Sequence, residues 1–198
     1  MRKIIAAALL AAPLLASANL IANGSFEADA QAAGTWSIYP NLTGWTGGQF
    51  GIELRNNVAG AAYDGVNFVE LDTTRNSLMN QSIGTSLGQT YELSFAYSGR
   101  EGVSAASNGI EVFWNGLSQG VFAAPGAPSG HLWSVFTLNV AGAAGSSSLL
   151  FQAVGVDDSL GGSLDAVSLT PAIPEPETYA LMLAGLAAVG FVARRRKA

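Results

Sequence analysis

Between residues 19 and 170, short runs of alternating apolar and polar residues follow one another, and no stretch keeps a helical period. Alternation with a period of two is typical of strands that bury one face. Gly, Asn, Asp and Ser separate the runs at regular intervals, as they do in turns. We therefore predict strands at residues 50–55, 66–71, 90–98, 109–114, 120–123, 132–140, 148–154 and 164–169.

The alternation also assigns the strand faces. Ile52 and Leu54 point away from the side that carries Glu53 and Arg55. Burying each large apolar side chain contributes about 1.5–3 kcal/mol to the free energy of folding. The dipeptide Asn115-Gly116 lies between two runs and is the strongest hairpin signal. These patterns predict an all-β fold, a jelly-roll β-sandwich, in which the large aromatics Trp45 and Trp114 are expected in the core. The same alternation gives the run at residues 90–98 one apolar face, made of Tyr91, Leu93, Phe95 and Tyr97.

Residues 1–18 have the pattern of a secretory signal peptide. Arg2 and Lys3 precede an apolar run at residues 4–15, and small residues close the segment at 16–18. We expect signal peptidase to cut before Asn19. The alternative is a first transmembrane helix, but the apolar run is too short for one.

The C-terminal segment combines three features. Pro174-Glu175-Pro176 precedes an uncharged apolar run at residues 179–193, which predicts a single helix. At 1.5 Å per residue this helix is about 22 Å long, so it spans a hydrocarbon core of roughly 30 Å only marginally. The alternative is a buried C-terminal helix of a soluble core, but such a helix has a polar face and this one has none. The positive-inside rule predicts membrane retention by a basic cluster that stays cytoplasmic, namely Arg194, Arg195, Arg196 and Lys197.

These three features together resemble the PEP-CTERM sorting signal of Gram-negative bacteria. The resemblance implies that an exosortase-like membrane protease cuts near Pro174-Glu175-Pro176, which is then a substrate and not a catalytic site. It also implies brief anchoring in the inner membrane and delivery to the cell surface or extracellular matrix. The expected division of the chain is a signal peptide at 1–18, a β-sandwich at 19–171 and a sorting signal at 172–198.

The charge of the middle segment restricts its partners. Residues 19–173 contain twelve acidic and three basic residues, a net charge of −9. This argues against nucleic-acid binding, which needs a basic face. The chain has no cysteine, so it offers no disulfide, no thiol nucleophile and no thiolate zinc site.

Both ends of the middle segment carry a second resemblance. Asn-Leu-Ile-Ala-Asn-Gly-Ser-Phe-Glu opens it at residues 19–27, Gly44-Trp45 follows, and Leu-Asp-Ala-Val-Ser-Leu closes it at 164–169. This order resembles galactose-binding-like jelly rolls, the fold of many carbohydrate-binding modules. The resemblance implies a structural calcium held by Glu27 and Asp165, whose oxygens are of the kind that calcium prefers. The alternative is a solvated Glu27 and a turn-capping Asp165.

A sugar-binding module needs exposed aromatic rings and a few polar groups. The aromatic candidates include Trp36, Tyr39, Tyr63 and Trp133, of which Trp36 and Trp133 are preferred. Glu70 and Arg100, with Glu53 and Arg55 beside them, are the candidates for binding hydroxyl groups. The alternatives are that the rings belong to the core and that Arg100 pairs with an acidic neighbour.

An enzymatic function has weaker support. His131 is the single histidine, and no Gly-x-Ser-x-Gly elbow is present. Glutamates on the predicted strands permit a catalytic pair without indicating one. We therefore expect no enzyme but a non-catalytic module that binds extracellular polysaccharide. The alternatives are a structural or adhesion protein of the matrix without a glycan ligand and, after it, a hydrolase.

Overall fold

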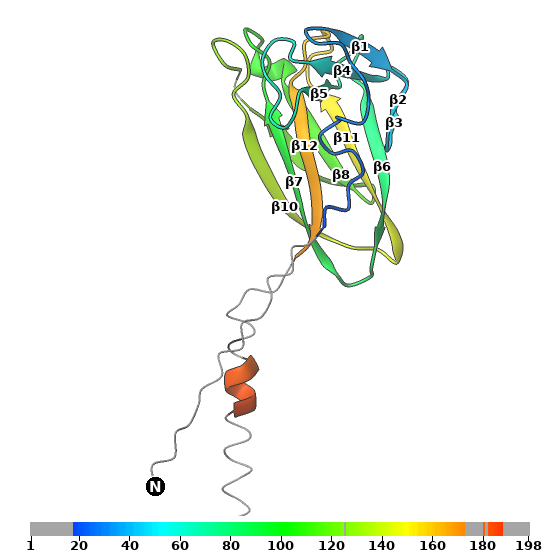
Figure 1. Cartoon of the computed structure of the whole chain (residues 1–198), viewed down its shortest axis with the longest axis vertical. Coiled ribbons are helices and arrows are strands. Elements are labelled where there is room, and N and C mark those ends of the chain that lie inside the picture. Colours follow the sequence, from blue (N-terminus) through cyan, green and yellow to red (C-terminus); the bar gives the residue numbers. More distant parts are fainter. Residues whose placement is uncertain (1–17, 125, 173–179, 181, 188–198) are drawn as a thin grey trace, which may run out of the picture.

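The computed structural model describes residues 18–124, 126–172, 180 and 182–187, and most of these residues form a two-layer β-sandwich (Figure 1). The all-β prediction is confirmed. The predicted signal peptide up to residue 17, Pro174-Glu175-Pro176 and the basic cluster lie outside the described residues. Within the predicted C-terminal helix, residues 180 and 182–187 are helical. No helix in the described part of the chain is long and apolar enough to cross a membrane.

Each layer is a six-stranded antiparallel sheet. Sheet A has the order β1 (Trp36–Tyr39), β4 (Ile52–Asn56), β5 (Asn67–Glu70), β12 (Ser163–Pro171), β7 (Thr90–Ser98) and β10 (Ser134–Ala141). Sheet B has the order β2 (Asn41–Leu42), β3 (Trp45–Gly47), β6 (Leu78–Thr85), β11 (Gly145–Val154), β8 (Gly109–Trp114) and β9 (Leu117–Ala123). A short 3₁₀ turn, η1 (Ala105–Ser107), precedes β8.

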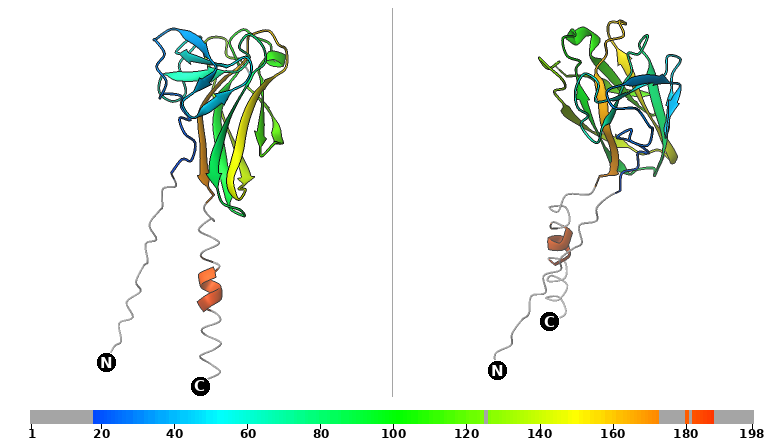
Figure 2. Two further views of the ribbon diagram at one scale, coloured as in Figure 1. Left: turned by 90° about the vertical axis from the view of Figure 1, so that its right-hand side faces the viewer. Right: turned by 45° about the horizontal axis from the view of Figure 1, so that its top comes forward.

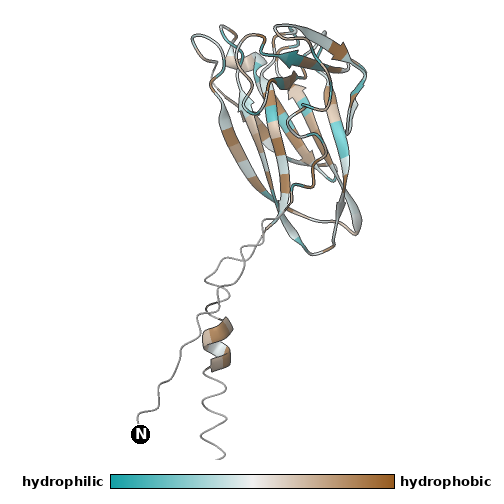
Figure 3. Cartoon of the chain, in the orientation of Figure 1, coloured by the Kyte–Doolittle hydropathy of each residue, from teal (hydrophilic) through white to brown (hydrophobic). Residues whose placement is uncertain are grey.

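The predicted strands agree with the observed ones where alternation is regular. The bounds of β7 and β8 match the prediction residue for residue, and Asn115-Gly116 joins β8 to β9 with positive φ at both residues. Figure 3 shows apolar and polar bands alternating along the long strands. The sequence pattern missed the short strands β1 to β3. It also missed β6, where the polar Gln81 faces inward.

The space between the sheets is filled mainly by aromatic rings. Phe95 of sheet A contacts Phe151 of sheet B, with ring centroids 5.3 Å apart, and also Phe122 and Phe136. Trp45 lies 6.2 Å from Phe151. Trp45 and Trp114 are both buried, as predicted. These aromatic contacts hold the two sheets together, and the chain has no cysteine that could form a disulfide between them.

The outer face of sheet A is also buried, which alternation did not predict. Every residue of β4 and β5 is buried, although only alternate ones face the core. Two segments cover this face: a loop at residues 57–66 and a segment at 127–133. The backbone oxygen of Ala61 in the loop accepts hydrogen bonds from the side chains of His131 and Trp133 in the segment. The sandwich therefore has a second buried layer outside sheet A.

The two ends of the sandwich differ. The Leu20 amide donates to the Leu169 oxygen at 2.8 Å, so the start of the domain lies beside the end of β12. Ser163, the first residue of β12, lies at the opposite end, which is formed by the loops after β5, β7 and β11 (Figures 1 and 2). The sorting segment thus leaves the sandwich at the end opposite these loops.

We expect Phe95→Ala to lower the free energy of unfolding by about 3–5 kcal/mol, because it removes a ring that both sheets bury. Chemical denaturation of the full chain in detergent micelles measures this. Val135→Ala, on an exposed position of β10, is the control and should change stability by less than about 0.5 kcal/mol. Equal effects of the two substitutions would contradict the assignment of the core.

Candidate functional site

The outer face of sheet A carries a buried ion network, which we call the Arg55 cluster: Glu53, Arg55, Glu70 and Arg100. Arg55 Nε lies 2.6 Å from Glu53 Oε1, and Arg55 Nη2 lies 2.6 Å from Glu70 Oε2. Glu53 and Glu70 are paired across β4 and β5, so their side chains share one face. Arg100 Nη1 also lies 3.4 Å from Glu70 Oε2. One fully buried guanidinium therefore joins two buried carboxylates.

Burial raises the pKa of Glu70 to about 8, since water no longer solvates its charge. The positive charges of Arg55 and Arg100 lower this pKa in part, and the negative charge of Glu53 raises it further. Glu70 is only 1% exposed. The amide of Gly161 and the two arginines hold Glu70 below the surface, so a ligand contact by Glu70 stays a prediction that this burial does not favour. The alternative, an Arg100–Glu70 pair, is observed.

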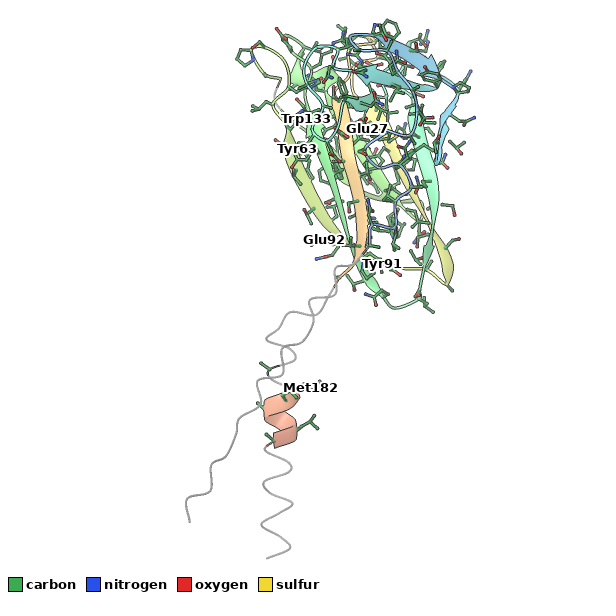
Figure 4. The ribbon with its side chains drawn as sticks, viewed as in Figure 1. Glu27, Tyr63, Tyr91, Glu92, Trp133 and Met182 are labelled. Atoms are coloured by element: carbon green, nitrogen blue, oxygen red, sulfur yellow. The ribbon has the colours of Figure 1, made fainter. Side chains whose placement is uncertain are left out.

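Beside the Arg55 cluster lies an aromatic cluster: Tyr63, Phe68, His131 and Trp133. Phe68 is fully buried, and its ring centroid is 4.7 Å from that of His131 and 6.0 Å from that of Trp133. Tyr63 meets Trp133 edge to face at 6.1 Å, and Figure 4 shows the two side by side. Tyr63 is 50% exposed and Trp133 is half-buried. This pair therefore forms the solvent-facing rim of the cluster.

Hydrogen bonds fix the orientation of these rings. Trp133 Nε1 donates to the oxygen of Ala61 at 3.1 Å, and His131 Nδ1 lies 2.8 Å from the same oxygen. A carbonyl oxygen only accepts, so Nδ1 carries the proton and Nε2 accepts from Ser163 Oγ at 3.1 Å. Burial lowers the pKa of His131, which favours this neutral form. Ser163 is 1% exposed, so its hydroxyl offers no accessible nucleophile.

Trp36 extends the same face. Trp36 pairs with Arg55, and Arg55 pairs with Phe68, so all three side chains lie on the outer side of sheet A. Two strand spacings separate Trp36 from Phe68, which is about 10 Å. Trp36 is 53% exposed. The structure therefore brings the two predicted tryptophans to one face, with the buried Arg55 between them.

The two predicted calcium ligands both bind one loop. Glu27 Oε1 accepts the amides of Val66 and Asn67 at 2.8 and 2.6 Å. Asp165 Oδ2 accepts the amides of Tyr63 and Asp64 at 2.8 and 2.9 Å. Amide hydrogens repel a cation, so these oxygens, as they lie, fit a loop anchor better than a calcium site. In the described parts of the chain, no three His, Cys, Asp or Glu side chains form a group that could hold a metal. Calcium at Glu27 and Asp165 stays a prediction.

Burial also changes the acidity of Asp165. It raises the pKa of Asp165 to about 7, against the lowering effect of the amides of Asp64, Ala166 and Tyr63. The loop at residues 57–66 is therefore held by a carboxyl group that titrates near neutral pH.

Comparison with known proteins identifies the end of the chain. Residues 172–197 match the PEP-CTERM protein-sorting motif. The chain carries this sorting signal. The motif implies export and processing by an exosortase, so the predicted recognition of the C-terminal segment is confirmed.

The sandwich matches part of much longer proteins. It is 33% identical over 153 residues to the multifunctional-autoprocessing repeats-in-toxin of Vibrio cholerae, and 34% over 152 residues to that of Vibrio vulnificus. These matches cover 77% and 75% of this chain but only 3% of each toxin. The chain thus corresponds to a small part of the toxins.

Several solved structures superpose on the sandwich at low sequence identity. The K1 cleaved adhesin domain of Lys-gingipain from Porphyromonas gingivalis superposes with a TM-score of 0.53 at 15% identity, covering 70% of this chain and 98% of that domain. The structure of TmCBM61 in complex with β-1,4-galactotriose has a TM-score of 0.49 at 16% identity and covers 79% of this chain and 100% of that chain. A family 35 carbohydrate binding module from an environmental isolate has a TM-score of 0.45 at 18% identity and covers 59% of this chain and 85% of that chain. The adhesin likeness confirms the β-sandwich and nothing beyond the fold.

We expect Arg55→Met to lower the free energy of unfolding by about 3–5 kcal/mol, because it leaves buried Glu53 without its cation and Glu70 with only the more distant Arg100. Arg75→Met is the matched control, since Arg75 pairs with Asp157 in an exposed position and should cost less than about 1 kcal/mol. Chemical denaturation compares the two variants. A small loss for Arg55→Met would show that the cluster does not stabilise the covered face.

The pKa of Asp165 predicts a pH dependence of stability. The folded protein raises this pKa from 3.8 to about 7, so the folded state holds the proton more tightly than the unfolded chain. This contribution is fully present below about pH 4 and is lost as the pH rises through about 7. The free energy of unfolding of the wild type, relative to Asp165→Asn, should fall over that range. Parallel curves for the two proteins would contradict the prediction.

Proposed function

We propose that the sandwich is a non-catalytic module that binds extracellular polysaccharide through the outer face of sheet A. The observation that carries this proposal is the Tyr63–Trp133 pair, which exposes aromatic surface in a fixed orientation. Sugar rings stack on such surfaces, and the bond of Trp133 to Ala61 keeps its ring from turning. A pre-oriented ring loses little conformational entropy when a ligand binds.

Two further features of the face suit a polymer. Trp36 offers a second exposed ring, so a chain of several sugar units could contact both aromatic positions. The side chain of Arg100 is 24% exposed, and its guanidinium has donors left for hydroxyl groups. We propose that Trp36, Tyr63, Trp133 and Arg100 contact the ligand.

The same face gives little support to hydrolysis. Glu53 and Glu70 are bound to one arginine and are buried, so neither is placed to protonate a glycosidic oxygen. The Ser163–His131 pair is covered in the same way. We therefore propose a binding role and no catalytic one.

A second candidate function is that of a structural or adhesion protein in the matrix. The sheet edges formed by β9 and β10 carry no charged residue in these strands, and β9 exposes Leu117 and Val121. Uncharged edge strands favour pairing between copies, because nothing repels an added strand. Self-association without glycan binding would favour this function.

Binding of the full chain to a panel of bacterial exopolysaccharides tests the leading proposal. We expect saturable binding that weakens by about tenfold in Tyr63→Ala and in Trp133→Ala, since a lost stacking ring removes about 1.4 kcal/mol. Leu132→Ala is the control, because Leu132 is exposed beside Trp133 but contributes no ring. The melting temperature of each variant confirms folding. Absence of binding to every glycan by a folded protein would contradict the proposal.

A further inference from the structure

At the loop end of the sandwich, two buried oxygen atoms accept no hydrogen bond from any described residue. They are Asp72 Oδ1 and Asn76 Oδ1. Asp72 is only 1% exposed, although it carries a carboxyl group. Leaving a buried acceptor without a partner costs about 1–3 kcal/mol, and more for a charged group. Such a pair of atoms therefore calls for a positive partner.

The two oxygens belong to side chains that lie on one face. Asp72 and Asn76 form an isolated antiparallel bridge across the turn between β5 and β6. Directly opposite residues in such a bridge have their Cβ atoms about 4.5–5.5 Å apart and point to the same side. Two partial or full negative charges that point the same way repel each other unless a cation lies between them.

Neighbouring contacts hold both side chains in place. Asp72 Oδ2 accepts the amides of Asp158 and Leu160 at 3.3 and 3.2 Å. Asn76 Nδ2 donates to the oxygen of Gly155 at 3.2 Å, which leaves its Oδ1 as the free acceptor. Each side chain thus has one polar atom hydrogen-bonded to the loop at residues 155–160 and one oxygen, Oδ1, without a partner. The arrangement is a preformed pair of ligands and not a loose acidic patch.

The charges around the pair are unbalanced. Asp157 Oδ1 accepts the amide of Asn76 at 2.7 Å, and the side chain of Asp158 accepts from Ser107. Arg75 pairs with Asp157 in an exposed position, and Arg100 donates to the oxygen of Ser159 in the same loop while it pairs with Glu70. Burial raises the pKa of Asp72, and the nearby Asp158 raises it as well. An additional cation would relieve this repulsion.

There is also room beside Asp72. A cavity of about 10 Å³, near the size of one water molecule, is lined by Asp72 together with Tyr97, Gly161 and apolar core residues. A water molecule beside Asp72 could complete the coordination of an ion held by Asp72 and Asn76.

We propose that Asp72 and Asn76 hold a calcium ion that fastens the loop at residues 155–160 to the turn between β5 and β6. Carboxylate, amide and water oxygens are the ligands that calcium takes, and its irregular coordination tolerates an incomplete protein cage. The site is distinct from the pair Glu27 and Asp165, which bind the loop at residues 57–66. It lies at the end of the sandwich opposite the sorting segment.

Calcium content and thermal stability of the full chain in detergent micelles test the site. After dialysis against calcium at pH 8, the wild type should retain calcium, and its melting temperature should exceed that in chelator by about 5–10 °C at 100 times the Kd. Asp72→Asn should weaken binding at least tenfold, because it removes the ligand charge. Asn76→Asp should bind more tightly than the wild type, so that the test does not depend on loss alone.

The double variant Glu27→Gln with Asp165→Asn is the matched control and should keep the stabilisation by calcium. Stabilisation lost in this control but kept in Asp72→Asn would overturn the proposal and locate calcium at Glu27 and Asp165. A wild type that retains no calcium would also overturn it. In that case a proton on Asp72, donated to Asn76 Oδ1, or a single water molecule would account for the two oxygens.

Discussion

One guanidinium group, that of Arg55, neutralises two carboxylates that adjacent strands bury on the outer face of sheet A. Glu53 and Glu70 lie directly opposite each other, and like charges in that position destabilise a sheet. Burying them removes the water that would otherwise solvate them. Arg55, held between the two carboxylates, therefore offsets the charge that this covered face buries.

This constraint explains why strand positions were easier to predict than the candidate site. Tyr91, Leu93 and Phe95 alternate with polar residues, and a period of two is enough to find β7. β6 escaped detection because Gln81 occupies an inward position and bonds to the backbone of Ala22 and Gly44. The strands β1 to β3 have two to four residues each, too few for any period to appear.

The site was predicted in part. Trp36 and Trp133 were found by residue type, and β-pairing explains how Trp36 comes to the face that Trp133 contacts through Phe68. The burial of Glu70 could not be predicted, because alternation tells which side of a sheet a residue faces but not what covers that side. The pairing of Asp72 with Asn76 depends on one turn and on a loop about 80 residues away. No local pattern in the sequence indicates such a contact.

The positions of the two ends connect these features to sorting. The PEP-CTERM motif begins at residue 172, one residue after β12 ends. β12 runs the length of sheet A, and its nine residues extend about 30 Å. The loops that contain Asp72 and Asn76 are therefore at the end of the sandwich opposite the start of the motif. The calcium site that we propose there thus lies about the length of β12 away from the segment that the exosortase implied by the motif would process.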